Sequence, residues 1–218
     1  MRRTSIASLA VLVASLAFAP RAGAHRLDEC LQAMRVTIDI DRISLDLDLT
    51  PGASIADRMF ATLDSNHDGE ISDEEAHAYA QRVLDSIAVS VDGRPAPVML
   101  IRRRFPTLRE MRGGVGIIHL SAQTAVPPAV GRHQVSYGNS FLPDLSVYLA
   151  NALVPSDDRV HIGEQRRDFL QRSLTVDYRV TASRSISRIG WSVTLFAMIG
   201  TLVVARRTRS LVASPARS

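Results

Sequence analysis

Apolar and polar residues alternate in two segments near the start of the chain, residues 31–38 and 43–49. A period of two is typical of strands that bury one face and expose the other. The stretch Asp39-Ile40-Asp41 between these segments is suited to turning the chain. We therefore predict a β-hairpin at the start of the domain.

After Pro51-Gly52 the apolar period changes to that of a helix. We predict a first helix with Ser54 as its N-cap and a second helix over residues 72–87. The buried faces of these helices are predicted to be Ile55, Met59, Phe60 and Leu63 in the first and Tyr79, Val83, Leu84 and Ile87 in the second.

Downstream of these helices the pattern is again that of strands. Residues 89–91 and 98–101 flank Asp92-Gly93, a pair that favours a tight hairpin turn. About eight short strands in all predict a mainly β fold, a β-sandwich, with the helix pair at about residues 54–87 inserted between the second and third strands. The remaining candidate strands cover residues 116–123, 134–137, 146–149, 160–162 and 173–181.

The two ends of the chain carry membrane-addressing patterns. Arg2 and Arg3 precede an apolar stretch and the small-residue sequence Ala22-Gly23-Ala24, which predicts a signal peptide at residues 1–24. Residues 189–205 are apolar or weakly polar over about 17 positions, close to the shortest length that spans a bilayer. We predict a periplasmic domain (25–183), a linker (184–188), a single transmembrane helix (189–205) and a cytoplasmic tail (206–218), with a buried core helix as the alternative for 189–205.

Charge supports this division of the chain. The formal net charge is +4, but three arginines lie in residues 1–24 and six lie in residues 184–218. Residues 25–183 therefore hold 17 arginines against all 22 acids, a net charge of −5 that makes nucleic acid an unfavourable partner. The chain has no lysine, which favours a GC-rich bacterial source and an anchor in the inner membrane. Cys30 is the single cysteine, so the alternatives for it are a buried thiol or a disulfide to a second chain.

The strongest chemical signal is the twelve-residue segment from Asp64 to Glu75, in which oxygen-bearing side chains alternate around one glycine. It resembles the calcium loop of an EF-hand, and with its flanking helices this resemblance covers only residues 60–87. The resemblance implies calcium ligands at Asp64, Asn66, Asp68, the Glu70 carbonyl, Ser72 and Glu75, with a sharp turn at Gly69. Ile71 would pack inward, and His67 would face solvent.

This loop is expected to serve as a structural calcium site rather than a sensor. EF-hands usually occur in pairs, and no second loop of this kind occurs in the sequence. A lone site of the extracellular type binds calcium weakly, with a dissociation constant on the order of 10⁻⁴ to 10⁻³ M. Ser72 and Glu75 also form a capping-box pattern that would begin the second helix.

Other residues indicate weaker hypotheses. His25 would become the mature N-terminus, where its amine and imidazole suit copper, nickel or cobalt. The alternative is a histidine that signal cleavage leaves there without a metal-binding role. The segment Ala24-His25-Arg26-Leu27 resembles exported segments that precede nickel and cobalt permeases, which implies an accessory role in metal transport as the alternative function. Arg102, Arg103 and Arg104 are interpreted as a solvated strand end or as a contact for anionic lipid.

Enzymatic activity is not expected, because no nucleophile elbow, phosphate loop or zinc-protease motif occurs in the sequence. His119 and His133 lie on predicted strands that allow them to approach each other, but no ligand pattern accompanies them. We expect a calcium-binding interaction module whose partner is an unidentified membrane or periplasmic protein.

Overall fold

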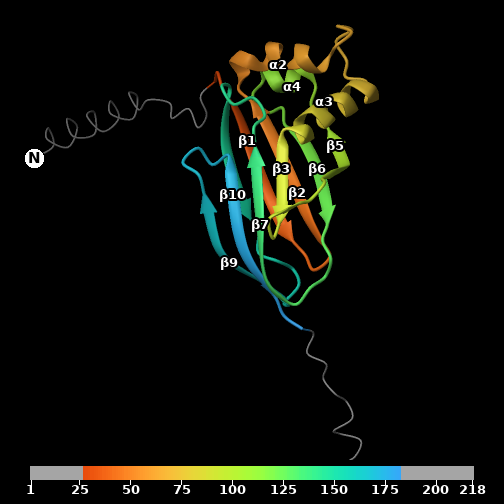
Figure 1. Cartoon of the computed structure of the whole chain (residues 1–218). Coiled ribbons are helices and arrows are strands. Elements are labelled where there is room, and N and C mark those ends of the chain that lie inside the picture. Colours follow the sequence, from red (N-terminus) through yellow and green to blue (C-terminus); the bar gives the residue numbers. More distant parts are fainter. Residues whose placement is uncertain (1–26, 183–218) are drawn as a thin grey trace, which may run out of the picture. The chain divides into compact units, whose positions relative to one another are not determined.

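The computed structural model describes residues 27–182, which are mainly β with a few short helices (Figure 1). The strands are β1 (Cys30–Ile38), β2 (Arg42–Pro51), β3 (Ile87–Val91), β4 (Arg94–Pro95), β5 (Met99–Arg104), β6 (Ile118–Ala125), β7 (Gly131–Asn139), β8 (Ser146–Ala152), β9 (Val160–Arg167) and β10 (Ser173–Val180). The helices are the 3₁₀ turn η1 (Ala53–Ile55), α2 (Ala56–Leu63), α3 (Asp73–Asp85) and α4 (Leu108–Arg112).

The strands form two sheets of five strands each. The first sheet has the order β5-β6-β2-β1-β8, and the second has the order β4-β3-β7-β10-β9. Neighbouring strands are antiparallel throughout except β1 and β8, which are parallel. Within residues 27–182, buried side chains of both sheets and of the helices belong to one hydrophobic core.

The predicted N-terminal hairpin is confirmed. Strands β1 and β2 pair from Cys30↔Pro51 to Ile38↔Ile43, and every second residue of each strand is buried. This alternation follows from the period of two in the sequence, because successive side chains of a strand point to opposite faces. Cys30 is fully buried, and burial raises the pKa of its thiol to about 12, so it behaves as an inert core residue.

A buried polar contact joins the two sheets. Gln32 on β1 is 1% exposed, and its Oε1 accepts a hydrogen bond of 2.8 Å from Nδ2 of Asn139 on β7. The Gln32 amide also donates to the Phe141 carbonyl and to the Ser146 hydroxyl, at 2.7 and 2.8 Å. Because buried polar groups cost free energy when unpaired, this network favours one relative placement of the two sheets.

The two longer helices lie between β2 and β3 in sequence, as predicted, and α2, α3 and α4 gather at one end of the sheets (Figure 1). The predicted N-cap at Ser54 is wrong, because Gly52 caps η1 and no side chain caps either η1 or α2. The second helix ends at Asp85, and Ile87 instead begins strand β3. Short helix α4 was not expected, although Thr107 and Glu110 form a capping box that is visible in the sequence.

The second predicted hairpin is only partly correct. Asp92 and Gly93 both have positive φ angles, 51° and 75°, as a tight hairpin turn requires. The returning strand β4 is only two residues long, however, and β5 pairs with β6 in the other sheet. Pro95 and Pro97 explain the interruption, because proline has no N–H to donate to a strand ladder.

Several predictions fall on residues outside the described range. These are the signal peptide at 1–24, His25, the linker at 184–188, the transmembrane helix at 189–205 and the tail at 206–218. Within residues 27–182, no helix has the length and apolar character needed to cross a membrane.

Candidate metal centre

The acidic loop, residues 64–75, connects α2 to α3 at the helical end of the molecule. Its first residue, Asp64, is the C-cap of α2, and Ser72 is the N-cap of α3. Both Asp64 and Glu75 are buried, with 4% and 8% of their surfaces exposed, whereas the residues from Ser65 to Glu70 are exposed. The loop therefore has a buried carboxylate close to each end.

In the first half of the loop, side-chain oxygens accept hydrogen bonds from the loop backbone. Asp64 accepts from the N–H groups of Asp68 and Gly69 at 3.1 and 2.9 Å. Asn66 Oδ1 accepts from Asp68 N at 2.9 Å, and Asp68 Oδ1 accepts from Glu70 N at 2.9 Å. Each of these oxygens retains a further lone pair, because a carboxylate or amide oxygen accepts about two bonds.

Two residues in the loop adopt left-handed backbone conformations. Gly69 has a φ of 87°, which matches the sharp turn expected there. His67 has a φ of 62° and an exposed side chain, so it faces solvent as predicted. A positive φ is uncommon for a residue with a Cβ, so His67 is the one strained residue of this turn.

In the second half, Glu75 holds the two ends of the loop together. Its Oε1 accepts from Ser65 N, Ser65 Oγ and Asn66 N at 2.7, 2.8 and 3.1 Å. Its Oε2 accepts from Ser72 N and Ser72 Oγ at 3.0 and 2.9 Å, and Ser72 Oγ in turn accepts from Glu75 N. The predicted capping box is therefore confirmed, and the Glu75 carboxylate is saturated by donors of the loop.

These donors determine the electrostatics of Glu75. The Ser72 backbone N–H, then the Ser65 and Ser72 hydroxyls, lower the pKa of Glu75 to about 2 because each stabilises the charged form. The first turn of α3 carries Asp73 and Glu74 as well, where negative charge is favoured by the helix dipole. Glu75 consequently keeps its charge well into the acidic range.

Helix α3 links this loop to the sheets. Tyr79 is buried and packs edge-on against Phe105 and Phe141, with ring centroids 5.9 and 5.8 Å apart. The guanidinium of Arg103 on β5 contacts Asp73 at 3.1 Å. Ile71 is partly buried against the hydrophobic core, as predicted. A change in the loop would therefore reach the core through α3.

The donor set suits a hard cation, because Asp64, Asn66, Asp68 and Glu75 offer only oxygen. These oxygens, however, already accept hydrogen bonds from N–H and O–H groups of the loop. Among residues 27–182, no group of three or more His, Cys, Asp or Glu side chains converges in a way that would hold a metal ion. Glu70 is exposed and Ser72 is engaged by Glu75. Metal binding would require Glu75 to exchange protein donors for the ion.

His119 and His133, which lie on predicted strands, belong to different sheets. His119 on β6 contacts Asp48 at 2.6 Å, and His133 on β7 contacts Asp92 at 2.8 Å. Ser121, two residues from His119, donates its hydroxyl to Asp46 rather than to the imidazole. The approach of His119 and His133 that the predicted strands would allow is therefore not found, and each imidazole has its own aspartate partner.

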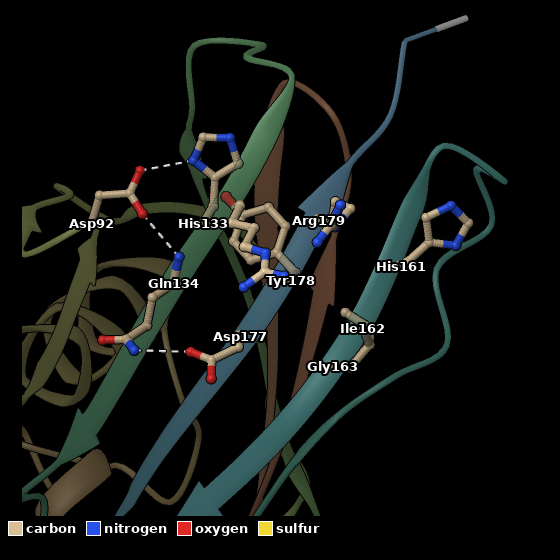
Figure 2. A pocket seen from close by; sticks show the side chains of 10 residues that line it. Asp92, His133, Gln134, His161, Ile162, Gly163, Asp177, Tyr178 and Arg179 are labelled. Atoms are coloured by element: carbon tan, nitrogen blue, oxygen red, sulfur yellow. Dashed lines mark hydrogen bonds and ion pairs between the residues drawn. The ribbon is translucent and has the colours of Figure 1, made fainter. Parts of the chain in front are cut away.

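A hollow of about 610 Å³ lies on the second sheet (Figure 2), and none of its lining residues belongs to the acidic loop. Its lining includes Arg132, His161 and Arg179, none of which formed a recognisable motif in the sequence. These residues are separated by 18 positions or more along the chain, so only strand pairing brings them together. No family model, curated protein or solved structure shows a significant match to this chain.

Proposed function

We propose that this protein binds calcium through a single EF-hand-like loop, residues 64–75, inserted in a β-sandwich domain that is exported and anchored in the inner membrane. The observation that carries the proposal is the coincidence of an oxygen-only donor pattern with a helix-loop-helix. The loop has a glycine in the left-handed conformation at the place where the calcium motif turns.

The ligands would be Asp64, Asn66 and Asp68 from the first half of the loop and Glu75 from α3, with Glu70 and Ser72 as weaker contributors. Asp64, Asn66 and Asp68 accept hydrogen bonds while retaining lone pairs, so they can accept a cation without losing the turn. Calcium would supply the positive charge that the acids of the loop lack. Magnesium, which requires a tighter octahedron, should compete poorly.

Glu75 would be the residue that couples calcium to the fold. Its carboxylate connects Ser65 at the beginning of the loop with Ser72 at the start of α3. Replacing part of this hydrogen bonding by an ion would still connect the same two points. We therefore propose a structural clamp rather than a sensor, because α3 is held to the sheets by Tyr79 and by the Arg103–Asp73 contact.

Isothermal titration calorimetry of the full-length chain with calcium tests the proposal. We expect a single site with a dissociation constant on the order of 10⁻⁴ to 10⁻³ M, and a much smaller response to magnesium. Glu75→Gln should weaken calcium binding by at least about tenfold, because it removes a charged ligand.

The matched control is Glu74→Gln, which makes the same change of charge on the neighbouring exposed residue. It should alter calcium affinity by no more than about twofold, since exposed charges are screened. An absence of calcium heat in the wild-type chain at millimolar concentration would refute the proposal, as would equal losses in the two variants.

The proposed cellular placement rests on sequence patterns near the two ends of the chain. An apolar segment followed by Arg206, Arg207 and Arg209 satisfies the positive-inside rule for a helix with its C-terminus in the cytoplasm. Protease treatment of spheroplasts should then cleave the region 27–182 and spare a tag placed after Ser218. Cleavage of that tag from outside would refute the proposed orientation.

A further inference from the structure

A row of basic side chains crosses three neighbouring strands of the second sheet. In the strand register, Arg179 on β10 lies directly opposite Arg132 on β7 and directly opposite His161 on β9. We call Arg132, Arg179 and His161 the basic row. Its members are 18 or more positions apart in sequence, and the pairing of β7, β10 and β9 places them side by side.

The basic row lies on the outer face of its sheet. Arg179 is exposed between buried Tyr178 and buried Val180, and His161 is exposed beside buried Val160. Arg132 is exposed as well. Because side chains alternate along a strand, these three project to the side opposite the core.

The acids close to the basic row already have other partners. Asp177 accepts hydrogen bonds from the two terminal guanidinium nitrogens of Arg166, at 2.8 and 3.1 Å, and a third from the Gln134 side-chain amide. Asp92 contacts His133 and accepts from Gln134 N, both at 2.8 Å (Figure 2). Among residues 27–182, the guanidinium groups of Arg132 and Arg179 have neither an ion pair nor a hydrogen bond.

Like charges placed directly opposite each other on adjacent strands repel, so the basic row is unfavourable unless something else compensates it. The surface beside it is open. Strand β9 has a bulge where Gly163 and Glu164 face the single residue Asp177. A Cβ on Gly163 would lie 3.1 Å from the Asp177 carbonyl oxygen, so glycine permits this close approach and adds no side chain to the hollow (Figure 2).

We propose that the basic row is a binding site for a phosphate-bearing anion. Each guanidinium presents planar N–H donors that match the oxygens of a phosphate, and two of them side by side can bind one group from two directions. His161 adds an imidazole at the outer end of the row. The hollow of about 610 Å³ leaves room for the phosphate and the group attached to it.

A phosphate group of this kind has two possible sources, and the place of the row in the chain bears on one of them. Arg179 lies two residues before Thr181, where β10 has ended and the chain continues toward residues 189–205. This is the end of the sheets opposite to the helices (Figure 1). The phosphate could belong to an anionic phospholipid headgroup or to a soluble phosphate compound. The proposal does not depend on calcium, since the row and the acidic loop share no residue.

The experiment compares two double variants of the full-length chain in nonionic detergent. R132Q/R179Q removes the two arginines of the row, and R58Q/R109Q removes two exposed arginines of α2 and α4 at the helical end. Binding is measured by calorimetry with inorganic phosphate and, separately, with mixed micelles that contain phosphatidylglycerol or phosphatidylcholine. The control variant has the same net charge, so it reports nonspecific attraction.

We expect the wild-type chain to bind inorganic phosphate, phosphatidylglycerol or both, and R132Q/R179Q to lose about tenfold or more of that affinity. R58Q/R109Q should stay within about twofold of the wild type. Binding of phosphatidylglycerol alone assigns the site to a headgroup, and binding of inorganic phosphate assigns it to a soluble compound. The proposal is overturned if neither probe binds, or if both double variants weaken binding equally.

Discussion

The acidic loop and the basic row are both charged surfaces, but they satisfy their charges in opposite ways. In the loop, Asp64 and Glu75 accept hydrogen bonds from donors within the loop itself. In the row, Arg132 and Arg179 lie opposite each other on the neighbouring strands β7 and β10, and no carboxylate or carbonyl of residues 27–182 accepts a hydrogen bond from their guanidinium groups. The loop is therefore complete before any ligand arrives, whereas the row is not.

The loop and the row are therefore expected to bind their ligands with different energetics. A loop that is stabilised by its own donors must exchange hydrogen bonds for a cation, so its affinity is a difference between two favourable states. The two unpaired guanidinium groups of the row have no such competitor, and an anion would remove the repulsion between them as well as form contacts. Calcium binding is thus expected to be weak, and the row should respond more directly to its ligand.

The largest effect that would test this comparison is that of acid on the loop. The folded-state pKa of Glu75 is about 2, below its ordinary value of 4.5. The stability that Glu75 contributes is therefore full above about pH 4.5 and is lost as the pH falls toward 2. Chemical unfolding of Glu75→Gln across this range should show a smaller decline with acid than the wild type.

Asp157 provides the control for the acid experiment. Its pKa is also lowered to about 2, chiefly by the hydrogen bonds from Arg159. Asp157→Asn should remove a different part of the acid dependence, and the two variants together should remove more than either one. An unchanged pH profile in Glu75→Gln would show that the loop is not held by this carboxylate.

A second test concerns the turn of the loop. Gly69→Ala should destabilise the calcium-free protein by about 1–2 kcal/mol, because alanine resists a φ of 87°. Gly138→Ala on β7 is the control, since a Cβ there meets no atom within 4 Å and no positive φ is required. Urea unfolding in the presence of a chelator measures both. Equal stability of the two variants would show that the turn relaxes when Gly69 is replaced.

A third, smaller effect is expected at the beginning of α3. Ser72→Ala should cost about 1 kcal/mol, because it removes the N-cap acceptor of Glu75 N and a donor to the Glu75 carboxylate. Ser54→Ala should cost much less, since Ser54 caps neither η1 nor α2. Thermal unfolding of the two variants would contradict the structure if Ser54→Ala proved the more damaging.

The smallest effect is expected in the basic row, and it has the opposite sign. Arg179→Gln should stabilise the ligand-free protein by a few tenths of a kcal/mol at low salt, because it relieves repulsion from Arg132. The gain should disappear as salt is added. Arg166→Gln, which breaks the contact with Asp177, should instead be destabilising. A loss of stability in Arg179→Gln at low salt would mean that its charge is compensated.

The acidic loop was predictable because its signal is local. The loop from Asp64 to Glu75 consists of one turn and the start of α3. Its residues are close in sequence, so the order of residue types is enough to predict which of them lie close in space. The capping box of Ser72 and Glu75 and the exposure of His67 were predictable for the same reason. The hydrogen bonds from Ser65 and Asn66 to Glu75 were not, because a motif pattern assigns ligands without showing which protein donors compete for them.

Sequence patterns were also sufficient for the mainly β class, the first hairpin and the helical insertion, since periods of 2 and 3.6 residues are properties of neighbouring positions. They failed where pairing was long-range. The strand that follows Asp92-Gly93, residues 98–101, was predicted to pair with β3. In the structure this segment belongs to β5, which pairs with β6 in the other sheet. Ser54 was chosen as a cap on local grounds, yet Gly52 precedes η1.

The sequence by itself thus determined the positions of most strands, the two longer helices and the oxygen-rich loop, because each is encoded by residues close together in the chain. Only the tertiary structure decided that Arg132, Arg179 and His161 share one row and that Gly163 leaves the surface beside them open. The physical reason is that strand register joins residues by backbone hydrogen bonding between distant segments. No spacing along the chain records that pairing.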